Sequence, residues 1–253
     1  MSTESITFHD RDLPIEQRGF IRALNLERHL VGGGTPEEVE RLERDLAYFH
    51  TIERWVEDPG NYIDKGGAGN VYGFDKIRLC IKVMKNYRND PNSEYFDIGN
   101  SALVEAMLMR EVDGLEVSGA RAPTPVQAVV GEHVSAIIME RLNAVNVQHV
   151  LNGTVGYPQT FDFERFATGI SDYLDVLHSE KNIVHGDLFP RNLMINQETG
   201  APYLIDFGRS KMTGDLDPIQ GEKLKRADWS RLEETLDEVE AHYKKTTPAD
   251  EIG

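Results

Sequence analysis

Apolar residues recur along this 253-residue chain with two different periods. Short apolar runs at residues 79–84 and 136–139 favour β-strands between residues 59 and 142, with one helical stretch at 103–115. After residue 143 the apolar spacing becomes helical, in two groups: Phe163, Phe166, Ile170, Leu174 and Leu177, then Trp229, Leu232, Leu236 and Val239. Strands first and helices second predict an α+β fold with two lobes.

The first 58 residues are charged and show the spacing of helices. Thr35, Pro36 and Glu38 form a helix start, and apolar residues follow it at helical spacing: Val39, Leu42, Leu46 and Phe49. We therefore predict three parts, which are a helical extension over residues 1–58, a strand-rich lobe over 59–142 and a helix-rich lobe over 143–253.

Charge and cysteine content narrow the classes of partner. With 27 Lys and Arg against 43 Asp and Glu, the formal net charge is -16, which repels nucleic acids and anionic membranes. The single cysteine, Cys80, cannot form an internal disulfide, and no apolar stretch approaches the ~18 residues that span a bilayer. We expect a cytoplasmic protein with neither nucleic acid nor a membrane as partner, although delivery into a host cell would leave no mark in the sequence.

A glycine-rich run, DKGGAGNVYGF, occupies residues 64–74. Because they lack a Cβ, Gly66, Gly67 and Gly69 let backbone N–H groups close over phosphate oxygens. The same pattern also suits an ordinary hairpin turn.

The apolar run LCIK ends in Lys82, a side chain that is costly to bury unpaired. A lysine in a strand is usually solvated at a sheet edge, but Lys82 follows the glycine run and precedes Glu105 on the predicted helix. We predict that Glu105 pairs with Lys82 and directs it at the α- and β-phosphates of a nucleotide. Glu111, on the same helix, is the alternative partner.

Two further segments carry a candidate base and oxygen ligands. In IVHGDLFPRNLMI, Asp187 suits the orientation of an attacking hydroxyl, and Asn192, five residues later, suits a divalent ion. Asp187 could instead cap a turn, and His185 is interpreted as packing support. In YLIDFGRS a strand delivers Asp206 to a glycine turn, where a carboxylate suits Mg²⁺ bridging the β- and γ-phosphates.

In this order the segments resemble the signature set of the protein-kinase superfamily over residues 64–228. The kinase glycine loop corresponds to Asp64, Gly66, Gly69 and Val71, so aspartate replaces its first glycine. The resemblance implies that residues 138–142 are the hinge and that the adenine meets Cys80, Met139, Glu140 and Leu142. It also implies that Asp228 lies in a helix that supports the catalytic loop.

Departures from the usual pattern point to particular branches. Gly186 replaces the arginine of most regulated kinases, and H-G-D resembles the catalytic loops of Kdo kinases, the KEOPS-complex kinase and aminoglycoside phosphotransferases. Phe189 replaces the lysine that Ser/Thr kinases place beside the γ-phosphate, with Arg191 as the candidate substitute. No A-P-E motif follows Asp206 and about one helix remains after Asp228, so we expect a reduced C-lobe like that of minimal bacterial effector kinases.

The resemblance implies a Ser/Thr protein kinase that uses ATP and Mg²⁺, or Mn²⁺, with Asp187 as base and Asn192 and Asp206 on the metal. A small-molecule kinase is the first alternative, favoured by H-G-D. A nucleotide-binding regulator with little transfer activity is the second, supported by Asp64 and Phe189. We favour a protein acceptor because little chain remains to build a small-molecule pocket. Neither the substrate's identity nor the oligomeric state is predicted.

Overall fold

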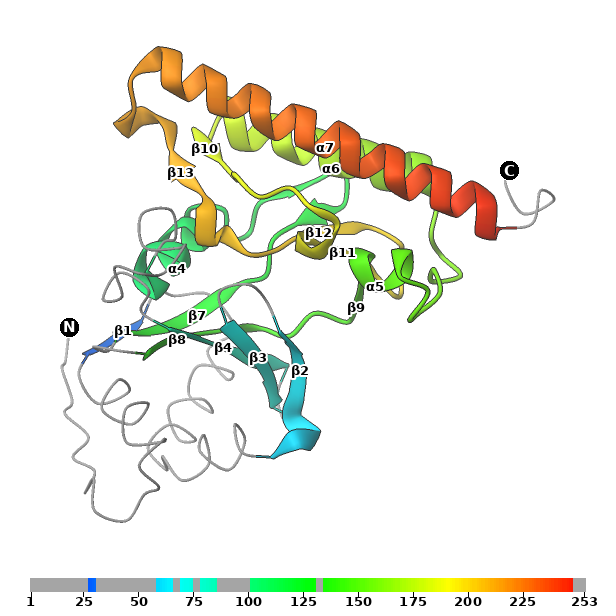
Figure 1. Cartoon of the computed structure of the whole chain (residues 1–253). Coiled ribbons are helices and arrows are strands. Elements are labelled where there is room, and N and C mark those ends of the chain that lie inside the picture. The colour runs from blue at the N-terminus through cyan, green and yellow to red at the C-terminus, as the bar shows by residue number, and fades with distance from the viewer. Residues whose placement is uncertain are drawn as a thin grey trace. The chain divides into compact units, whose positions relative to one another are not determined.

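A computed structural model describes residues 27–30, 58–65, 69–74, 78–85, 101–130 and 134–247. The chain forms two compact units, residues 1–113 with 124–141 and residues 114–123 with 142–253, and each has its own sheet (Figure 1). This division differs from the three predicted parts: residues 1–58 join the first unit, and Leu142 and residues 114–123 join the second. Residues 114–123 belong to the second unit because β6 (Ala120–Arg121) pairs with β12 (Pro202–Leu204) of that unit.

The first unit is built on an antiparallel sheet. Among the described residues this sheet has six strands, in the order β1 (Glu27–Leu30), β7 (Pro125–Val130), β8 (Val134–Glu140), β4 (Leu79–Lys85), β3 (Gly69–Phe74) and β2 (Tyr62–Lys65). A single 3₁₀ turn, η2 (Pro59–Asn61), leads into β2. Strands β4 and β8 contain the two apolar runs that were predicted to be strands, and they pair along their whole length.

Strand β1 lies inside the segment predicted to be a helical extension, so that prediction is wrong for these four residues. They pair antiparallel with β7 at the edge of the sheet. Pairing with a strand far along the chain outweighs the local helical pattern, as tertiary context often does. The predicted helix start at Thr35, Pro36 and Glu38 lies outside the described residues.

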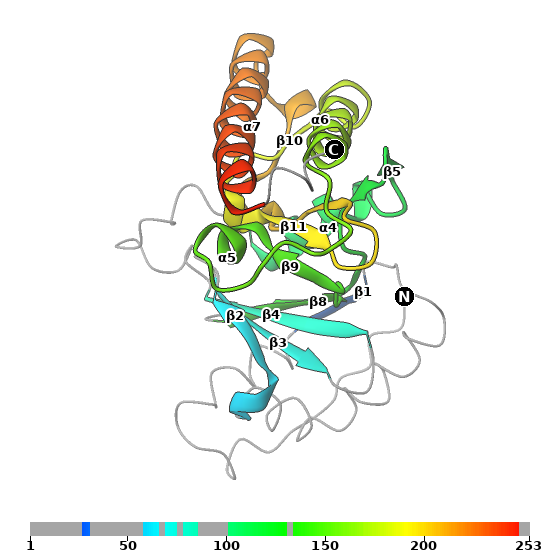
Figure 2. The same cartoon turned by 90° about the vertical axis from the view of Figure 1, so that its right-hand side faces the viewer.

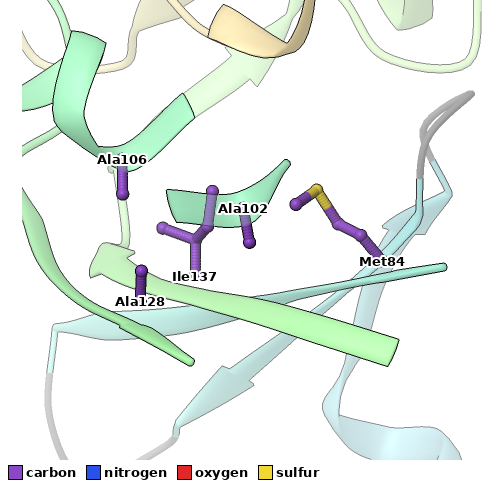
Figure 3. Close-up of a cluster of buried hydrophobic side chains, with 5 residues drawn as sticks. All are labelled: Met84, Ala102, Ala106, Ala128 and Ile137. Atoms are coloured by element: carbon purple, nitrogen blue, oxygen red, sulfur yellow. The ribbon is translucent and has the colours of Figure 1, made fainter. Parts of the chain in front are cut away.

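Helix α4 (Ala102–Glu111) packs on β7 and β8 and is shorter than the predicted stretch, because the chain turns at Gly114, where φ is +74°. The Ser101 side chain caps the helix by accepting a hydrogen bond from the Val104 N–H at 3.4 Å. Figure 3 shows the contact surface, in which sheet residues gather against two helix alanines: Met84, Ala128 and Ile137 against Ala102 and Ala106. This packing fixes the helix on the sheet and with it the position of Glu105.

The second unit contains a five-stranded sheet and a two-stranded one. The larger has the order β5 (Glu116–Val117), β6, β12, β11 (Leu193–Asn196) and β9 (Ala144–Asn146), and the smaller pairs β10 (Ile183–Val184) with β13 (Lys211–Met212). Its α-helices are α5 (Val147–Leu151), α6 (Phe163–Ser179) and α7 (Pro218–Thr246), and its 3₁₀ turns are η4 (Pro190–Asn192), η5 (Phe207–Arg209) and η6 (Thr213–Asp215).

Helices α6 and α7 lie side by side, as Figures 1 and 2 both show. Four of the five predicted apolar positions of α6 are buried, namely Phe166, Ile170, Leu174 and Leu177, and Phe163 in the first turn is half-buried. Helix α7 begins at a capping aspartate, Asp217, and runs past Asp228 as one continuous helix. Nowhere in the described parts of the chain does a helix combine the length and apolar character that a bilayer-spanning segment needs.

Candidate active site

The two ends of the glycine-rich run lie in paired strands. Strands β2 and β3 pair antiparallel, with Asp64 opposite Val71. A Cβ on Gly69 would lie 2.1 Å from the Val83 carbonyl oxygen, so only glycine fits at this position of β3. Gly66 and Gly67 lie outside the described residues.

Lys82 and Glu105 form a buried ion pair. The Lys82 Nζ lies 2.8 Å from the Glu105 Oε1, and the two side chains are 6% and 1% exposed. Lys82 stands in the middle of the sheet between Val71 and Ile137, and Glu105 stands in the first turn of α4, where the helix dipole favours a carboxylate. Glu111, the alternative partner, is exposed at the far end of the helix. Since a buried charge is stable only with its partner, each side chain holds the other in place.

The segment expected to meet adenine is tied into the sheet. Cys80 pairs with Met139 in register, and its Sγ lies 3.6 Å from the Glu140 carbonyl oxygen. Burial raises the pKa of the Cys80 thiol to about 12. The Glu140 N–H donates to the Thr124 carbonyl at 2.9 Å. Leu142, the last of the expected adenine contacts, belongs to the second unit.

In the second unit residues 185–192, the segment expected to be the catalytic loop, join β10 to β11, and Asp187 is buried there. The Asn192 Nδ2 donates to the Asp187 carbonyl at 2.7 Å and to its Oδ2 at 2.8 Å. Because this amide uses its nitrogen on Asp187, its oxygen is the atom left for a cation. The two residues, predicted from sequence to work together, are therefore in direct contact.

Gly186 has a conformation that explains its identity. Its φ is +76°, and a Cβ there would lie 2.8 Å from the Arg209 carbonyl oxygen. Any residue with a side chain would be strained in this position. The backbone conformation of the loop thus explains why glycine, and not the arginine of most regulated kinases, stands in the H-G-D motif.

Helix α7 supports this loop from Asp228, as expected. The buried Asp228 carboxylate accepts hydrogen bonds from the backbone N–H groups of His185, at 2.7 Å, and Gly186, at 2.8 Å. His178 of α6 lies 3.0 Å from the same carboxylate. About two turns further along α7, the Thr235 hydroxyl donates a hydrogen bond to the Leu188 carbonyl at 2.8 Å. The loop is therefore held on both sides of Asp187.

His185 is a packing residue, as interpreted from the sequence. Its ring is fully buried, meets Phe207 edge-on, and donates from Nε2 to the Ile205 carbonyl at 3.1 Å. Burial lowers the pKa of this imidazole, which is therefore neutral at neutral pH. A neutral, buried ring suits the support of the loop rather than proton transfer.

Asp206 stands beside Asn192. The Ile205 N–H donates to the Asn192 carbonyl at 3.0 Å, which joins the two segments next to the β11–β12 ladder. Asp206 has φ +65°, a left-handed conformation that costs energy in a non-glycine residue, and its Oδ1 accepts from the Gly208 N–H at 3.2 Å. Strain of this kind concentrates at functional positions.

The donor set at Asp206 and Asn192 fits a particular kind of cation. One carboxylate and one amide oxygen suit Mg²⁺, which keeps waters and binds with substrate phosphates rather than in an all-protein cage. The residues present therefore fit a divalent metal that arrives with a nucleotide.

Sequence reasoning missed two arginines, one beside Asp187 and one beside Phe189. The Arg209 Nη1 lies 3.7 Å from the Asp187 Oδ1, and the Arg231 guanidinium lies over the Phe189 ring at 4.3 Å. Arg231 shares the face of α7 that carries Asp228 and Thr235, because the three are spaced by three and four residues. That helical spacing was the available signal.

Comparison with known proteins agrees with this geometry. The family described as the protein kinase domain matches residues 60–222 of this chain. A probable bifunctional tRNA threonylcarbamoyladenosine biosynthesis protein of Methanocorpusculum labreanum is 29% identical over 155 residues, which are 61% of this chain and 25% of that protein. The EKC/KEOPS complex subunit bud32 of Dictyostelium discoideum is 22% identical over 163 residues, which are 64% of each chain.

The chain thus spans a quarter of the length of one curated relative and under two thirds of the other. The domain match itself covers more than half of this chain. The fold of this chain is the α+β fold of kinases. The relatives belong to the atypical branch, whose catalytic-loop motif the H-G-D sequence resembles. The chain belongs to the protein kinase family.

Proposed function

We propose that this protein transfers the γ-phosphoryl group of ATP, with Mg²⁺, to a serine or threonine hydroxyl of another protein. The observation that carries the proposal is the contact of Asn192 with Asp187, at 2.8 Å, on a loop that Asp228 anchors. Phosphoryl transfer uses a base at the acceptor hydroxyl and ligands that hold a metal beside it.

The chemistry of each side chain suggests its role in the transfer. Lys82, aimed by Glu105, would hold the α- and β-phosphates, while Asn192 and Asp206 would hold the metal. Bound ATP and its metal supply the phosphoryl group and neutralise charge on the leaving phosphates. Asp187 takes the acceptor's proton as the acceptor oxygen bonds to phosphorus, and the breaking phosphorus–oxygen bond leaves its electron pair on ADP.

A protein acceptor is favoured over a cationic small molecule by the charges around Asp187. Arg191 lies 2.8 Å from the Asp187 Oδ1 and Arg209 lies 3.7 Å from it. These guanidiniums would repel a polycationic ligand at the point where its hydroxyl must approach. A serine or threonine in a neutral or acidic segment meets no such repulsion.

The relatives support work within a complex. One relative is named as a subunit of the EKC/KEOPS complex. The other is named as a bifunctional protein, and this chain matches only a quarter of its length. We therefore propose that this kinase acts beside a second protein. Co-purification of a tagged copy from its own cells tests this, and recovery of the kinase alone would speak against it.

Incubation of the purified protein with γ-labelled ATP, alone and with lysate, tests the activity. We expect label in a protein band, lost in Asp187→Asn and kept in Asp175→Asn, which changes an exposed aspartate of α6. Label confined to small molecules would favour the small-molecule kinase. Retained ATP binding without any label would favour the nucleotide-binding regulator.

A further inference from the structure

A guanidinium lies against bare backbone at one end of the sheet in the first unit. A Cβ on Gly73 of β3 would lie 2.8 Å from the Arg141 Nη1 and 3.1 Å from its Cζ. The Ile63 Cδ1 of β2 would lie 3.2 Å from the same Cβ position. The guanidinium therefore fills the place of the side chain that Gly73 lacks, beside an isoleucine that is itself 40% exposed.

The backbone of Arg141 is fixed at this end of the sheet. Its N–H donates a hydrogen bond to the Arg78 carbonyl at 2.8 Å, and the Glu140 N–H donates to the Thr124 carbonyl at 2.9 Å. The Thr124 N–H in turn donates to the Glu140 Oε2 at 3.3 Å. Arg141 is thus anchored through its backbone, and the residue remains exposed to a ligand.

The strand register places this guanidinium on the same face of the sheet as Lys82. Val71 pairs with Lys82, and two residues further on Gly73 pairs with Cys80. Because paired residues point to the same side and side chains alternate, Gly73 and Cys80 face the side of Lys82, about 7 Å along the strands. Burial raises the pKa of the Cys80 thiol and the charge of Arg141 opposes that rise, which agrees with this placement.

What covers this face sets the direction in which a nucleotide can lie. On one side of Lys82, helix α4 packs over Met84 through its alanines, as Figure 3 shows. If Lys82 holds the α- and β-phosphates, as proposed, the ribose and the base extend to the other side, toward Gly73 and Cys80. The base then meets the surface that the Arg141 guanidinium and Ile63 form.

We infer that the Arg141 side chain binds the purine base of the nucleotide, its guanidinium stacked on the ring beside Ile63, and that Gly73 leaves the room for it. A guanidinium is planar and weakly hydrated, and it stacks on aromatic faces with a favourable cation–π interaction. The inference deepens the proposed function and rests on it, because the position of the base follows from the phosphates at Lys82.

Adenosine separates recognition of the base from attraction to the phosphates. Inhibition constants are measured by displacement of labelled ATP. We expect Arg141→Ala to weaken adenosine binding roughly 3- to 30-fold, the range of a cation–π contact, and to leave the affinity for magnesium tripolyphosphate unchanged. Arg110→Ala removes the charge of a partly exposed arginine of α4 and is the matched control. Adenosine affinity in Arg141→Ala equal to that of the wild type would overturn the inference.

Gly73→Ala tests whether the guanidinium must lie where it does. Because the guanidinium ends a flexible side chain, the new methyl group can displace it without unfolding the strand. We expect Gly73→Ala to weaken adenosine binding as Arg141→Ala does, and the double variant to bind no more weakly than either single variant. Losses that multiply in the double variant would contradict the inference. Arg141→Met, which keeps most of the apolar stem, replaces Arg141→Ala if that variant does not fold.

The contact with the base is observable directly in the wild-type protein. An aromatic ring shifts the NMR signals of protons near its face, so the Arg141 Nε–H signal should move when adenosine is added. Its absence from the spectrum of Arg141→Met assigns that signal. The Arg110 Nε–H signal should stay in place. An Arg141 signal that does not move at saturating adenosine would overturn the stacking.

The failure of this inference differs from the failure of the proposed function. If Arg141→Ala keeps the wild-type adenosine affinity while label transfer to protein depends on Asp187, the proposed function stands and the role of Arg141 is refuted. If Arg141→Ala loses adenosine affinity while the wild type transfers no label, Arg141 binds the base and the proposed function fails. A wild type that binds neither adenosine nor ATP contradicts both.

Discussion

Gly186 adopts φ +76° beside the Arg209 carbonyl, and both features exclude a side chain. Arginine, which most regulated kinases carry at this position, would need a different loop backbone. At the residue scale, then, a single backbone torsion accounts for the H-G-D motif.

Replacement of Gly186 by alanine should lower the free energy of unfolding by about 1–3 kcal/mol, the cost of a strained left-handed residue. Urea denaturation measures this change. Gly214→Ala is the matched control, because no atom lies within 4 Å of its Cβ position, and it should stay within about 0.5 kcal/mol of the wild type. Equal losses in the two variants would show that Gly186 is under no special strain.

Cys80 is buried, and its thiol has a pKa raised to about 12 from 9.0. The thiolate that reacts with iodoacetamide is therefore depleted roughly 1,000-fold near neutral pH relative to an unfolded chain. We expect slow labelling with or without ATP and fast labelling in urea, followed by mass spectrometry. Rapid labelling of the native protein that ATP suppresses would contradict this and place the thiol open to the nucleotide.

At the scale of elements, β4 and α4 each carry one charge of the Lys82–Glu105 pair, while α7 holds the catalytic loop through Asp228 and Thr235. The alanine-rich packing in Figure 3 sets the distance of α4 from the sheet. The packing of α4 and α7 therefore determines where Glu105 and the catalytic loop lie.

Removal of one charge of the buried pair, in Lys82→Met, should lower the free energy of unfolding by about 3–5 kcal/mol, because Glu105 stays buried without its cation. The double variant Lys82→Met/Glu105→Leu should regain most of this stability but not ATP binding. Urea denaturation and calorimetry measure the two properties. Arg110→Met, which breaks the pair of a partly exposed arginine of the same helix with Asp113 just beyond the helix end, is the control. A single variant as stable as this control would contradict the coupling.

At the scale of the whole molecule, the sequence was sufficient for features that depend on local pattern. The apolar runs predicted β4 and β8, helical spacing predicted α6, and motif order predicted that Lys82 would meet Glu105. The sequence was insufficient where contacts between distant segments determine the structure. Strand β1 forms only by pairing with β7, residues 114–123 join β12 of the second unit, and Arg231 reaches Phe189 across the fold.

Calorimetric titration with ATP and Mg²⁺ tests the central claim most directly, namely that Asp206 serves the metal and Asp187 serves the acceptor. The wild type and Asp187→Asn should bind with the same affinity, because Asp187 acts only when the hydroxyl is attacked. Asp206→Asn should lose the Mg²⁺-dependent part of the binding. Equal affinity in Asp206→Asn and the wild type would contradict the metal assignment and, with it, the proposed division of roles.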